Sequence, residues 1–408
     1  MKKIFILGCS AAAAKIIETV RAVDQTSEIF LLTFEECLPY QRHLFPQFVS
    51  KNCTNEEILI QPRSFYERQR VNLILNKKIS RIDFRKNLIV VEKDEPFNYD
   101  ALVITETGEY KFPDIKGANK LGVFGIKTFT EVNQITNRLS LVDTVVIRSS
   151  AWSGIKMAGA FQQRGKEVVL VVPADHRALA QLEPQGLGMI LRALEEKGIR
   201  VYQENDLVEI LGDGEVKAVR LKSKKVIATE MVIFDQTKVN LKLFADTPLK
   251  INEKICVDHS FKTNLPNVYA VDEVCELSEV QRGNFDIDGT EFMQQGVRAG
   301  NSLLGQEQLA SEENISLREV RINDVSIQFI GQTIDQGLLR KYVQRDPLAS
   351  VYKKFFIKEE SLAGAILINV PQSEQEQIKE WIEKKAKVAE LGHILGEQNS
   401  PSVENTSV

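Results

Sequence analysis

The chain has 408 residues, of which 43% are hydrophobic and 26% charged, with a formal net charge of -4. At roughly 150 residues per domain this length suggests two or three domains, and the ordinary composition excludes a disordered, collagen-like or coiled-coil protein. The weak negative charge and interspersed basic residues argue against a nucleic-acid partner. Glycine is scarce, at 23 residues against a usual share of roughly 7%.

The N-terminus imitates a lipoprotein signal, because Lys2 and Lys3 precede a short apolar stretch and then Cys9. That stretch is about five residues long, below the roughly 7–15 residues of a signal's apolar region. No apolar run approaches the ~18 residues needed to span a bilayer. We therefore expect a buried first strand, no membrane partner and a cytoplasmic protein.

The first 35 residues predict a strand, a helix and a second strand. Residues 4–7 form an apolar run that ends at Gly8, and residues 28–33 form another with Glu35 just beyond its end. Between them, residues 10–23 carry apolar side chains at helical spacing: Ala13, Ile16, Ile17 and Val20. This order predicts a βαβ unit, the mononucleotide-binding half of a doubly wound sheet.

The same pattern recurs from residue 144 onward. The predicted elements are strands at 144–147, 167–172 and 199–202 and helices at 154–164 and 185–197. Two further strands, at 207–211 and 216–221, are joined by Gly212-Asp213-Gly214, a strong hairpin signal. The chain is thus predicted to hold two nucleotide-binding units with β-meanders attached.

The region after residue 316 has a different pattern. Strands are predicted at 325–330, 352–358 and 362–368. Ser373 and Glu376 predict a capping box ahead of a helix with the apolar stripe Ile378, Trp381 and Ile382. We expect a small α+β domain over 316–392 and a disordered tail at 396–408, which has few apolar residues.

Cysteine and histidine give no sign of a metal site. Cys9, Cys37, Cys53, Cys256 and Cys275 include no C-x-x-C motif and no close pair in sequence. The four histidines are far apart in sequence: His43, His176, His259 and His393. We expect reduced structural or surface thiols and no bound metal.

Several motifs lie between residue 1 and about residue 390. They are PYQR at 39–42, YDALVI at 99–104, FPDIKG at 112–117, TNLPNVYA at 263–270, QGVRAGN at 295–301, YKK at 352–354 and LAGA at 362–365. Together they resemble the two-dinucleotide-fold flavoprotein reductases of the pyridine nucleotide-disulfide oxidoreductase family. Within that family the likeness is to rubredoxin reductases and the flavin-binding part of assimilatory nitrite reductase.

The resemblance implies an α/β fold of two Rossmann-like domains, the second inserted in the first, plus a C-terminal α+β domain. The implied bounds are 1–110 and 240–312 for the FAD-type domain, 111–239 for the NAD(P)-type domain and 316–392 for the C-terminal domain. In this family hydride passes from NAD(P)H to FAD, and electrons then pass to a protein or metal-centre acceptor. The resemblance thus implies FAD, an electron-transfer protein partner and, as one arrangement, a homodimer.

Members of the family without a redox-active disulfide pass electrons outward. This chain shows no such cysteine pair, and Cys37, near the flavin-side turn, is interpreted as a bystander.

The resemblance also marks a candidate FAD site. The G-x-G-x-x-G fingerprint, which brings a pyrophosphate against a helix N-terminus, is matched by Gly8, Ser10 and Ala13. Ser10 puts a side chain where the phosphates should approach. Glu35 stands where the family's ribose-binding acid would be, although it could equally be a solvated carboxylate at a strand end.

Two other flavin-contacting motifs are altered. The family's Ala-Thr-Gly reads Thr105-Glu106-Thr107-Gly108, either substituted or one residue out of register, and its Gly-Asp reads Asp272-Glu273. Two adjacent acids would repel a pyrophosphate unless a cation such as Arg42 neutralised them. The candidate cofactor-binding residues are Gly8, Ser10, Ala13, Glu35, Arg42, Thr107, Gly108, Asp272 and Glu273. No catalytic residue is identified.

The second unit has lost its fingerprint glycines. Residues 148–153 read RSSAWS, the nearest glycine, Gly154, is one place late, and Val172 stands at the position of the ribose acid. A glycine expected near residues 235–237 is also missing. We therefore expect that NAD(P)H does not bind.

Three hypotheses follow from these substitutions. The first is an FAD-dependent oxidoreductase with an altered pocket, reduced by a partner protein. The second is a non-catalytic pseudo-oxidoreductase that serves as a scaffold or sensor. The third is a second unit that binds another adenine nucleotide, with Arg148 and the following serines contacting phosphate.

Overall fold

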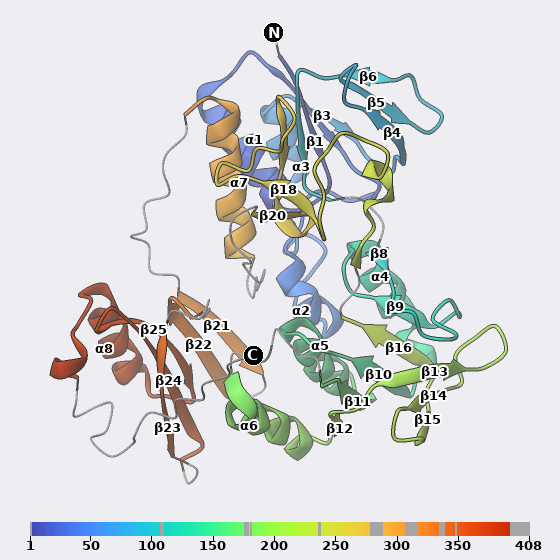
Figure 1. The fold of residues 1–408 in the computed structure, drawn as a ribbon. Coiled ribbons are helices and arrows are strands. Elements are labelled where there is room, and N and C mark those ends of the chain that lie inside the picture. The colour runs from blue at the N-terminus through green and yellow to red at the C-terminus, as the bar shows by residue number, and fades with distance from the viewer. Residues whose placement is uncertain are drawn as a thin grey trace. The chain divides into compact units, whose positions relative to one another are not determined.

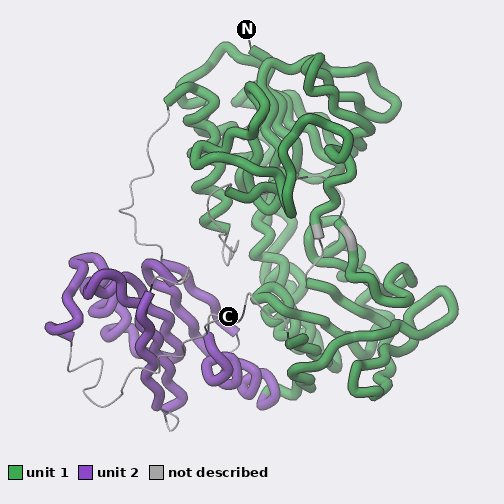
Figure 2. Tube along the Cα trace, viewed as in Figure 1, with its two compact units in different colours: residues 1–178, 197–310 green, residues 179–196, 311–408 purple. Residues whose placement is uncertain are grey.

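The computed structural model describes residues 2–106, 110–174, 179, 182–235, 238–277, 289–306, 317–322, 324–333, 339–346 and 349–391. The chain divides into two compact units, Met1–Ala178 with Lys197–Ala310 and Leu179–Glu196 with Ser311–Val408 (Figure 2). Among the helices in the described ranges, none has the length and apolar character that a bilayer crossing requires.

The first sheet is parallel, with the strand order β19-β7-β1-β2-β3; Figure 1 labels its strands β1 and β3. Its strands are β1 (Lys3–Leu7), β2 (Glu28–Leu32), β3 (Val71–Ile74), β7 (Ala101–Ile104) and β19 (Val268–Ala270). Two helices, α1 (Ala11–Val23) and α7 (Thr290–Leu303), pack against each other beside it. Because β19 follows the second sheet in the chain yet pairs with β7, the second Rossmann-like unit is inserted in the first, which confirms the predicted fold class.

The second sheet is also parallel, with the order β12-β11-β10-β16-β9. Its strands are β9 (Val123–Gly125), β10 (Thr144–Arg148), β11 (Glu167–Val172), β12 (Arg200–Gln203) and β16 (Met231–Phe234). The helices α4 (Phe129–Arg138) and α5 (Trp152–Gln163) belong to this part of the chain. Val146, Val169 and Val232 are fully buried, as expected for a sheet covered on both faces.

Two meanders flank these sheets: β4-β5-β6 (Ile79–Asp83, Leu88–Val91, Phe97–Asn98) and β13-β14-β15 (Leu207–Leu211, Ala218–Leu221, Val226–Ala228). The predicted hairpin is confirmed, since β13 and β14 pair antiparallel. The remaining short strands pair as β8 with β17 (Tyr110–Lys111, Lys238–Val239) and β18 with β20 (Ile255–Val257, Cys275–Leu277). The short helices are α2 (Phe45–Val49), α3 (Arg63–Arg68), η1 (Arg42–Leu44), η2 (Leu139–Leu141), η4 (Leu241–Phe244) and η5 (Asp272–Val274).

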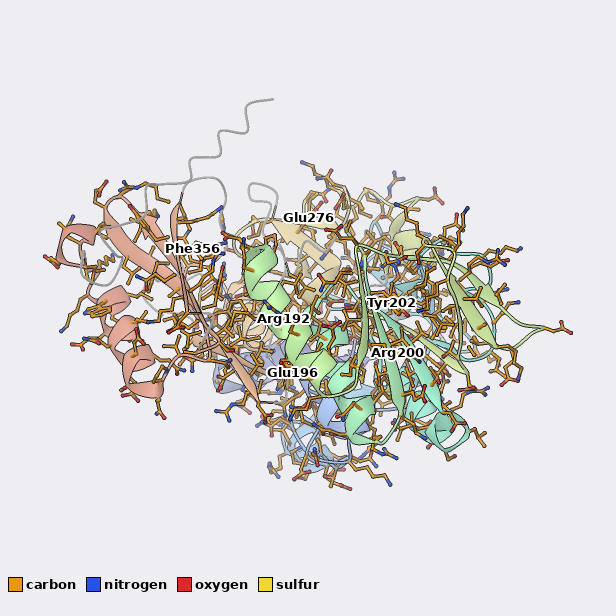
Figure 3. All side chains as sticks on the ribbon, turned by 90° about the horizontal axis from the view of Figure 1, so that it is seen from below. Arg192, Glu196, Arg200, Tyr202, Glu276 and Phe356 are labelled. Carbon is orange, nitrogen blue, oxygen red and sulfur yellow. The ribbon has the colours of Figure 1, made fainter. Side chains whose placement is uncertain are left out.

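The other unit is built on an antiparallel sheet with the order β21-β22-β25-β24-β23. Its elements are β21 (Leu317–Ile322), β22 (Val325–Gly331), β23 (Arg340–Asp346), β24 (Val351–Lys358), β25 (Ser361–Ile368), α6 (Glu183–Glu196), α8 (Gln372–Glu383) and η6 (Val388–Glu390). In Figure 3, Arg192 and Glu196 lie on α6 and Phe356 lies on the sheet. The three predicted strands are confirmed as β22, β24 and β25, whereas β21 and β23 were not predicted.

The predicted capping box at Ser373 is wrong. Helix α8 begins at Gln372, directly after Pro371 at φ -58° and ψ 144°, and has no side-chain cap. Proline fixes φ before the first helical residue, so Ser373 lies inside the first turn instead of capping it. Residues 396–408 lie outside the described residues, and the domain bounds stay a prediction.

Candidate functional site

The turn between β1 and α1 depends on Gly8. Its φ of 118° is a left-handed value that L side chains rarely adopt. A Cβ there would lie 2.3 Å from Thr105 Oγ1 and 2.9 Å from the Glu106 amide nitrogen. Glycine is thus required both by the backbone conformation and by the close approach of the segment after β7.

Ser10 and Ala13 lie at the start of α1, where the fingerprint places them. Ser10 is the N-cap of the helix, and its hydroxyl accepts a hydrogen bond from Ala13 N at 3.4 Å. Both side chains are buried. The Ser10 hydroxyl therefore satisfies the helix terminus, and its contact with a phosphate stays a prediction.

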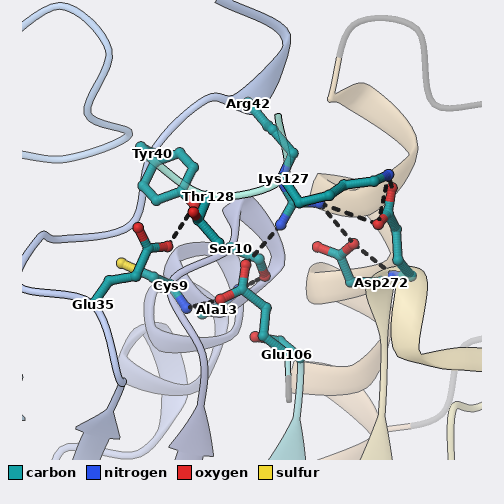
Figure 4. Close-up of polar contacts among 12 residues, drawn as sticks. Cys9, Ser10, Ala13, Glu35, Tyr40, Arg42, Glu106, Lys127, Thr128 and Asp272 are labelled. Atoms are coloured by element: carbon teal, nitrogen blue, oxygen red, sulfur yellow. Dashed lines mark hydrogen bonds and ion pairs between the residues drawn. The ribbon is translucent and has the colours of Figure 1, made fainter. Parts of the chain in front are cut away.

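Glu106 places a carboxyl group on this turn (Figure 4). Its Oε2 accepts from Cys9 N at 3.0 Å, and its Oε1 accepts from Arg42 Nη2 at 2.7 Å. The side chain is 5% exposed. Burial raises the pKa of Glu106 to about 8, although Arg42 works in the opposite direction. An acidic group of the chain itself thus lies on a backbone N–H that a dinucleotide phosphate would use.

Arg42 and Lys127 neutralise the two adjacent acids. Arg42 Nη1 lies 3.6 Å from Glu273 Oε2 and 4.0 Å from Asp272 Oδ1. Lys127 Nζ contacts both oxygens of Glu273, at 2.8 and 3.0 Å. Burial works to raise the pKa of Glu273, but Lys127 and Arg42 lower it to about 2. We call these residues, together with Glu106, the ion cluster.

Asp272 takes the backbone conformation of the glycine that the family carries. Its φ is 71°, and its backbone N–H donates to Gln295 Oε1 at 2.8 Å. The side chain is 2% exposed, and burial raises the pKa of Asp272 despite the opposing effect of Arg42. Aspartate tolerates this left-handed region better than most residues do, so the turn is preserved while a carboxyl group is added to it.

Glu35 faces the start of α4. Its Oε1 accepts from Tyr40 Oη at 2.6 Å, and its Oε2 accepts from the backbone and the hydroxyl of Thr130, both at 3.1 Å. Tyr40 Oη in turn accepts from Phe129 N at 3.2 Å. Glu35 is 1% exposed, so it is no solvated strand-end carboxylate. A negative charge at a helix N-terminus is stabilising, and here it satisfies two helix amides directly or through Tyr40.

The residues of the ion cluster do not fit the pyrophosphate of FAD in this arrangement. Cys9 N and Arg42 are already engaged by Glu106, and three carboxyl groups meet two cations, Arg42 and Lys127. A pyrophosphate at this turn would need the same donors, Cys9 N and Arg42, that the Glu106 carboxyl group already occupies. A phosphate could take this place only if Glu106 left it.

The second dinucleotide-type turn, between β10 and α5, is filled in a similar way. Asp235 Oδ2 accepts from Ser149 Oγ at 2.7 Å and from Ala151 N at 3.0 Å, and Oδ1 accepts from Ser150 N at 3.4 Å. Asp235 is 1% exposed, and burial raises its pKa. The carboxyl group that stands near the missing glycine therefore satisfies the N-terminus of α5.

Arg148, at the end of the strand before this turn, also has a partner inside the chain. Arg148 forms a bidentate pair with Asp206, at 2.6 Å from Nε to Oδ1 and 3.0 Å from Nη2 to Oδ2. A Cβ at Gly154 would lie 2.5 Å from Ser149 Oγ and 2.8 Å from Asp235 Oδ2. Gly154 thus permits the close packing of Asp235 rather than the approach of a ligand.

Two cysteines that are distant in the sequence meet at the first turn, which corrects the interpretation of Cys37 as a thiol without a partner. Cys9 Sγ lies 3.7 Å from Cys37 Sγ and donates to the Cys37 carbonyl oxygen at 2.9 Å. The sequence could not show this pair, because both residues lie in loops whose approach depends on the packing of β1 against β2.

The structure brings together most of the predicted site residues: Gly8, Ser10, Ala13, Arg42, Asp272 and Glu273. Thr107 and Gly108 lie outside the described residues, and Glu35 lies near Cys9 but is engaged by the start of α4. Sequence reasoning missed the roles of Glu106 and Lys127, for which the one available signal was the glutamate within the altered Ala-Thr-Gly motif. Among the described residues, no group of three or more potential ligands could hold a metal ion.

Comparison with known proteins places this geometry in context. A family model described as pyridine nucleotide-disulphide oxidoreductase matches residues 2–300. The chain is 20% identical over 407 residues to the assimilatory nitrate reductase electron transfer subunit of Bacillus subtilis (strain 168), covering 99% of this chain and 52% of that protein. It is 21% identical to the nitrite reductase [NAD(P)H] of the same organism, covering 96% of this chain and 48% of that protein. The chain thus spans about half the length of these curated relatives.

Solved structures share the fold. The covalent putidaredoxin reductase–putidaredoxin complex superposes with a TM-score of 0.83 at 15% identity, covering 97% of this chain and 96% of that one. NADH:rubredoxin oxidoreductase from Clostridium acetobutylicum gives a TM-score of 0.72 at 21% identity, covering 95% of this chain and 96% of that one. At these identities the likeness establishes the architecture of two Rossmann-like sheets and a C-terminal antiparallel sheet.

Proposed function

The chain belongs to the pyridine nucleotide-disulphide oxidoreductase family, and from this premise we propose that it is a pseudo-oxidoreductase that acts through protein contacts. The family's reductases use FAD and NAD(P)H as electron carriers. In this chain, by our proposal, its own carboxyl groups close both dinucleotide turns. The observation that carries the proposal is the Glu106 carboxyl group, which engages Cys9 N and Arg42 together.

Backbone amides at both dinucleotide-type turns and at the N-terminus of α4 have partners inside the chain. Glu106 and Asp235 lie on the first and second turns, and Glu35 lies on the N-terminus of α4. Buried donors need such partners for a stable fold. The internal carboxyl groups therefore allow the fold to be complete without a cofactor, as a scaffold or sensor requires.

The partner is proposed from the relatives. One relative is named an electron transfer subunit, and the putidaredoxin reductase structure contains putidaredoxin. We propose a protein of an electron-transfer chain as the partner of this chain, and a homodimer as its second association.

Flavin binding tests the proposal directly. Untagged protein purified without added flavin should show no flavin absorbance, and calorimetric titration with FAD or NADH should give no saturable heat. The double variant Glu106→Thr, Asp272→Gly removes both carboxyl groups, puts the family's glycine at position 272 and frees Cys9 N. We expect its FAD affinity to exceed that of the parent by roughly tenfold or more, since ~1.4 kcal/mol from the donors freed at Cys9 N and Arg42 gives that factor.

The control variant Glu36→Thr changes an exposed acid near the turn and should leave FAD affinity unchanged. Tight FAD binding by the parent protein, with reduction of that flavin by NADH, would overturn the proposal. It would instead support the second candidate function, an FAD-dependent reductase with an altered pocket. That candidate is favoured by one observation: Arg42 Nε is buried without a hydrogen-bond partner among the described residues.

A further inference from the structure

Two thiols meet at the first dinucleotide-type turn. The Cys9 and Cys37 sulfur atoms are 3.7 Å apart. A disulfide needs about 2.05 Å, so the sulfurs would have to approach by about 1.7 Å. We propose that Cys9 and Cys37 form a reversible intramolecular disulfide, which makes this turn an oxidation-sensitive modification site. The proposal is independent of whether the chain binds a flavin.

The local backbone allows the sulfurs to close this gap. Cys9 lies between the end of β1 and the start of α1, and Cys37 lies in the loop after β2, so neither residue is inside a helix or strand. A hydrogen bond of 3.4 Å from Tyr40 N to Cys9 O holds the two loops together. The sulfurs can therefore approach through movement of loop residues and side chains, without a break in a strand or helix.

The two thiols differ in solvent accessibility, and this difference decides which of them reacts first with an oxidant. Cys9 has no exposed surface, whereas Cys37 is half-buried and can meet a small oxidant from solvent. Burial, followed by Cys37 and the nearby acids Glu35 and Glu106, raises the pKa of Cys9 well above its ordinary value. Cys37 is thus the thiol that reacts first with the oxidant, and Cys9 is the thiol that resolves the oxidised product.

The step balances with a peroxide as oxidant. The Cys37 thiolate attacks one oxygen of hydrogen peroxide, the O–O bond breaks, and Cys37 sulfenic acid and water result. Cys9 sulfur then attacks the Cys37 sulfur, the S–S bond forms, and the hydroxyl group leaves with the Cys9 proton as a second water. Two thiols lose two electrons in total, and the peroxide gains them. A dithiol reductant reverses the link.

Thiol counting and peptide mapping of the full chain test the proposal. Protein reduced with dithiothreitol and freed of it is treated with hydrogen peroxide, denatured and assayed for free thiols. We expect the five thiols to fall to three and to return after renewed reduction. Mass spectrometry should find the Cys9 peptide joined to the Cys37 peptide, and the oxidised protein should melt at a higher temperature because a loop is closed.

The matched control is Cys53→Ser, because Cys53 is also half-buried but its thiol donates to the neighbouring Thr54 carbonyl. This variant should still form the link, whereas Cys37→Ser should not. Should Cys37→Ser fail to fold, mapping of the parent and of Cys53→Ser decides the matter. Oxidation of Cys37 to sulfinic acid without the link, links that involve only Cys53, or five unchanged thiols would each refute the proposal.

Discussion

Glu106 is a buried carboxyl group that accepts hydrogen bonds from both Cys9 N and Arg42 at the first turn of this fold. The segment that carries it lies close to the turn, since a Cβ on Gly8 would be 2.8 Å from the Glu106 Cβ. Asp235 has the corresponding place in the second turn. Each of the two turns therefore carries a buried acid that accepts hydrogen bonds from its own backbone amides.

Glu106 also predicts a pH dependence of stability. Its pKa is about 8 in the folded chain against an ordinary 4.5, so the folded state binds its proton more tightly than the unfolded state does. Stability from this group is complete below about pH 4.5 and falls as pH rises towards 8, by up to ~1.4 kcal/mol per unit of pKa difference. Glu106→Gln should remove this fall. Urea unfolding between pH 5 and pH 8 should show the variant gaining on the parent by a few kcal/mol.

Glu273→Gln is the control, because the pKa of Glu273 is lowered whereas that of Glu106 is raised. The pKa of Glu273 is about 2, so this carboxyl group is ionised throughout the same interval. Its contribution is lost only as pH falls from 4.5 towards 2. The variant should therefore be less stable than the parent by a constant amount between pH 5 and pH 8. If the unfolding free energies of Glu106→Gln and the parent changed in parallel between pH 5 and pH 8, the raised pKa of Glu106 would be contradicted.

At the scale of elements, α4 shows how one acid can serve a helix instead of a ligand. Thr128 and Glu131 form a capping box, and Glu35 with Tyr40 satisfies the amides of Phe129 and Thr130. All three first-turn amides of α4 thus have acceptors, since Glu131 N donates to Thr128. The start of α4 is therefore complete through residues of the chain itself.

Glu35→Ala should loosen this helix end. The variant leaves two α4 hydrogen bonds and one from Tyr40 unmade, so we expect a loss of about 2 kcal/mol of unfolding free energy. Hydrogen exchange should rise in the first turn of α4. Glu36→Ala, at an exposed neighbouring position, should change stability by less than ~0.5 kcal/mol. If both variants behaved alike, the capping role of Glu35 would be excluded.

The sequence predicts elements well where the signal is local. The strand at residues 167–172 and the hairpin around Gly212 depend on apolar runs and turn residues that lie within a few positions of each other. It misses β23, whose residues are mostly polar and half-exposed or exposed. It also misses the Cys9–Cys37 pair, because only tertiary packing brings residues 28 positions apart into contact. The first-turn residues were predictable from the family's fingerprint, but the partner of Cys9 N was not.

Helix α6 belongs to one compact unit, whereas its neighbours in the chain, β11 and β12, belong to the other. It lies in the chain between β11 and β12, yet it groups with the C-terminal sheet. Gly186 of α6 lies close to the fully buried Tyr352, since a Cβ there would be 3.3 Å from Tyr352 Cζ. This unit therefore needs two distant stretches of the chain, and a fragment starting at residue 311 would lack one of them.

An ion pair between β24 and α6 lies inside this unit, and we predict that its loss destabilises the unit. Lys354 Nζ on β24 lies 2.7 Å from Glu183 Oε1 at the start of α6, with the lysine side chain 4% and the glutamate side chain 32% exposed. Lys354→Ala should cost about 2–3 kcal/mol, less than the loss for a fully buried pair, because Glu183 can hydrate. Hydrogen exchange should rise in α6 and β24 and stay unchanged in β1 and β2.

Arg340→Ala supplies the comparison for Lys354→Ala, because it breaks the pair of Arg340 with Glu360, whose side chains are 56% and 66% exposed. Exposed pairs contribute little, so its effect should stay below ~1 kcal/mol. A Lys354→Ala effect as small as this, or a rise in exchange spread over both units, would show that α6 is held by apolar contacts alone. A rise confined to α6 and β24 would identify the Lys354–Glu183 pair as the link between the two stretches of chain.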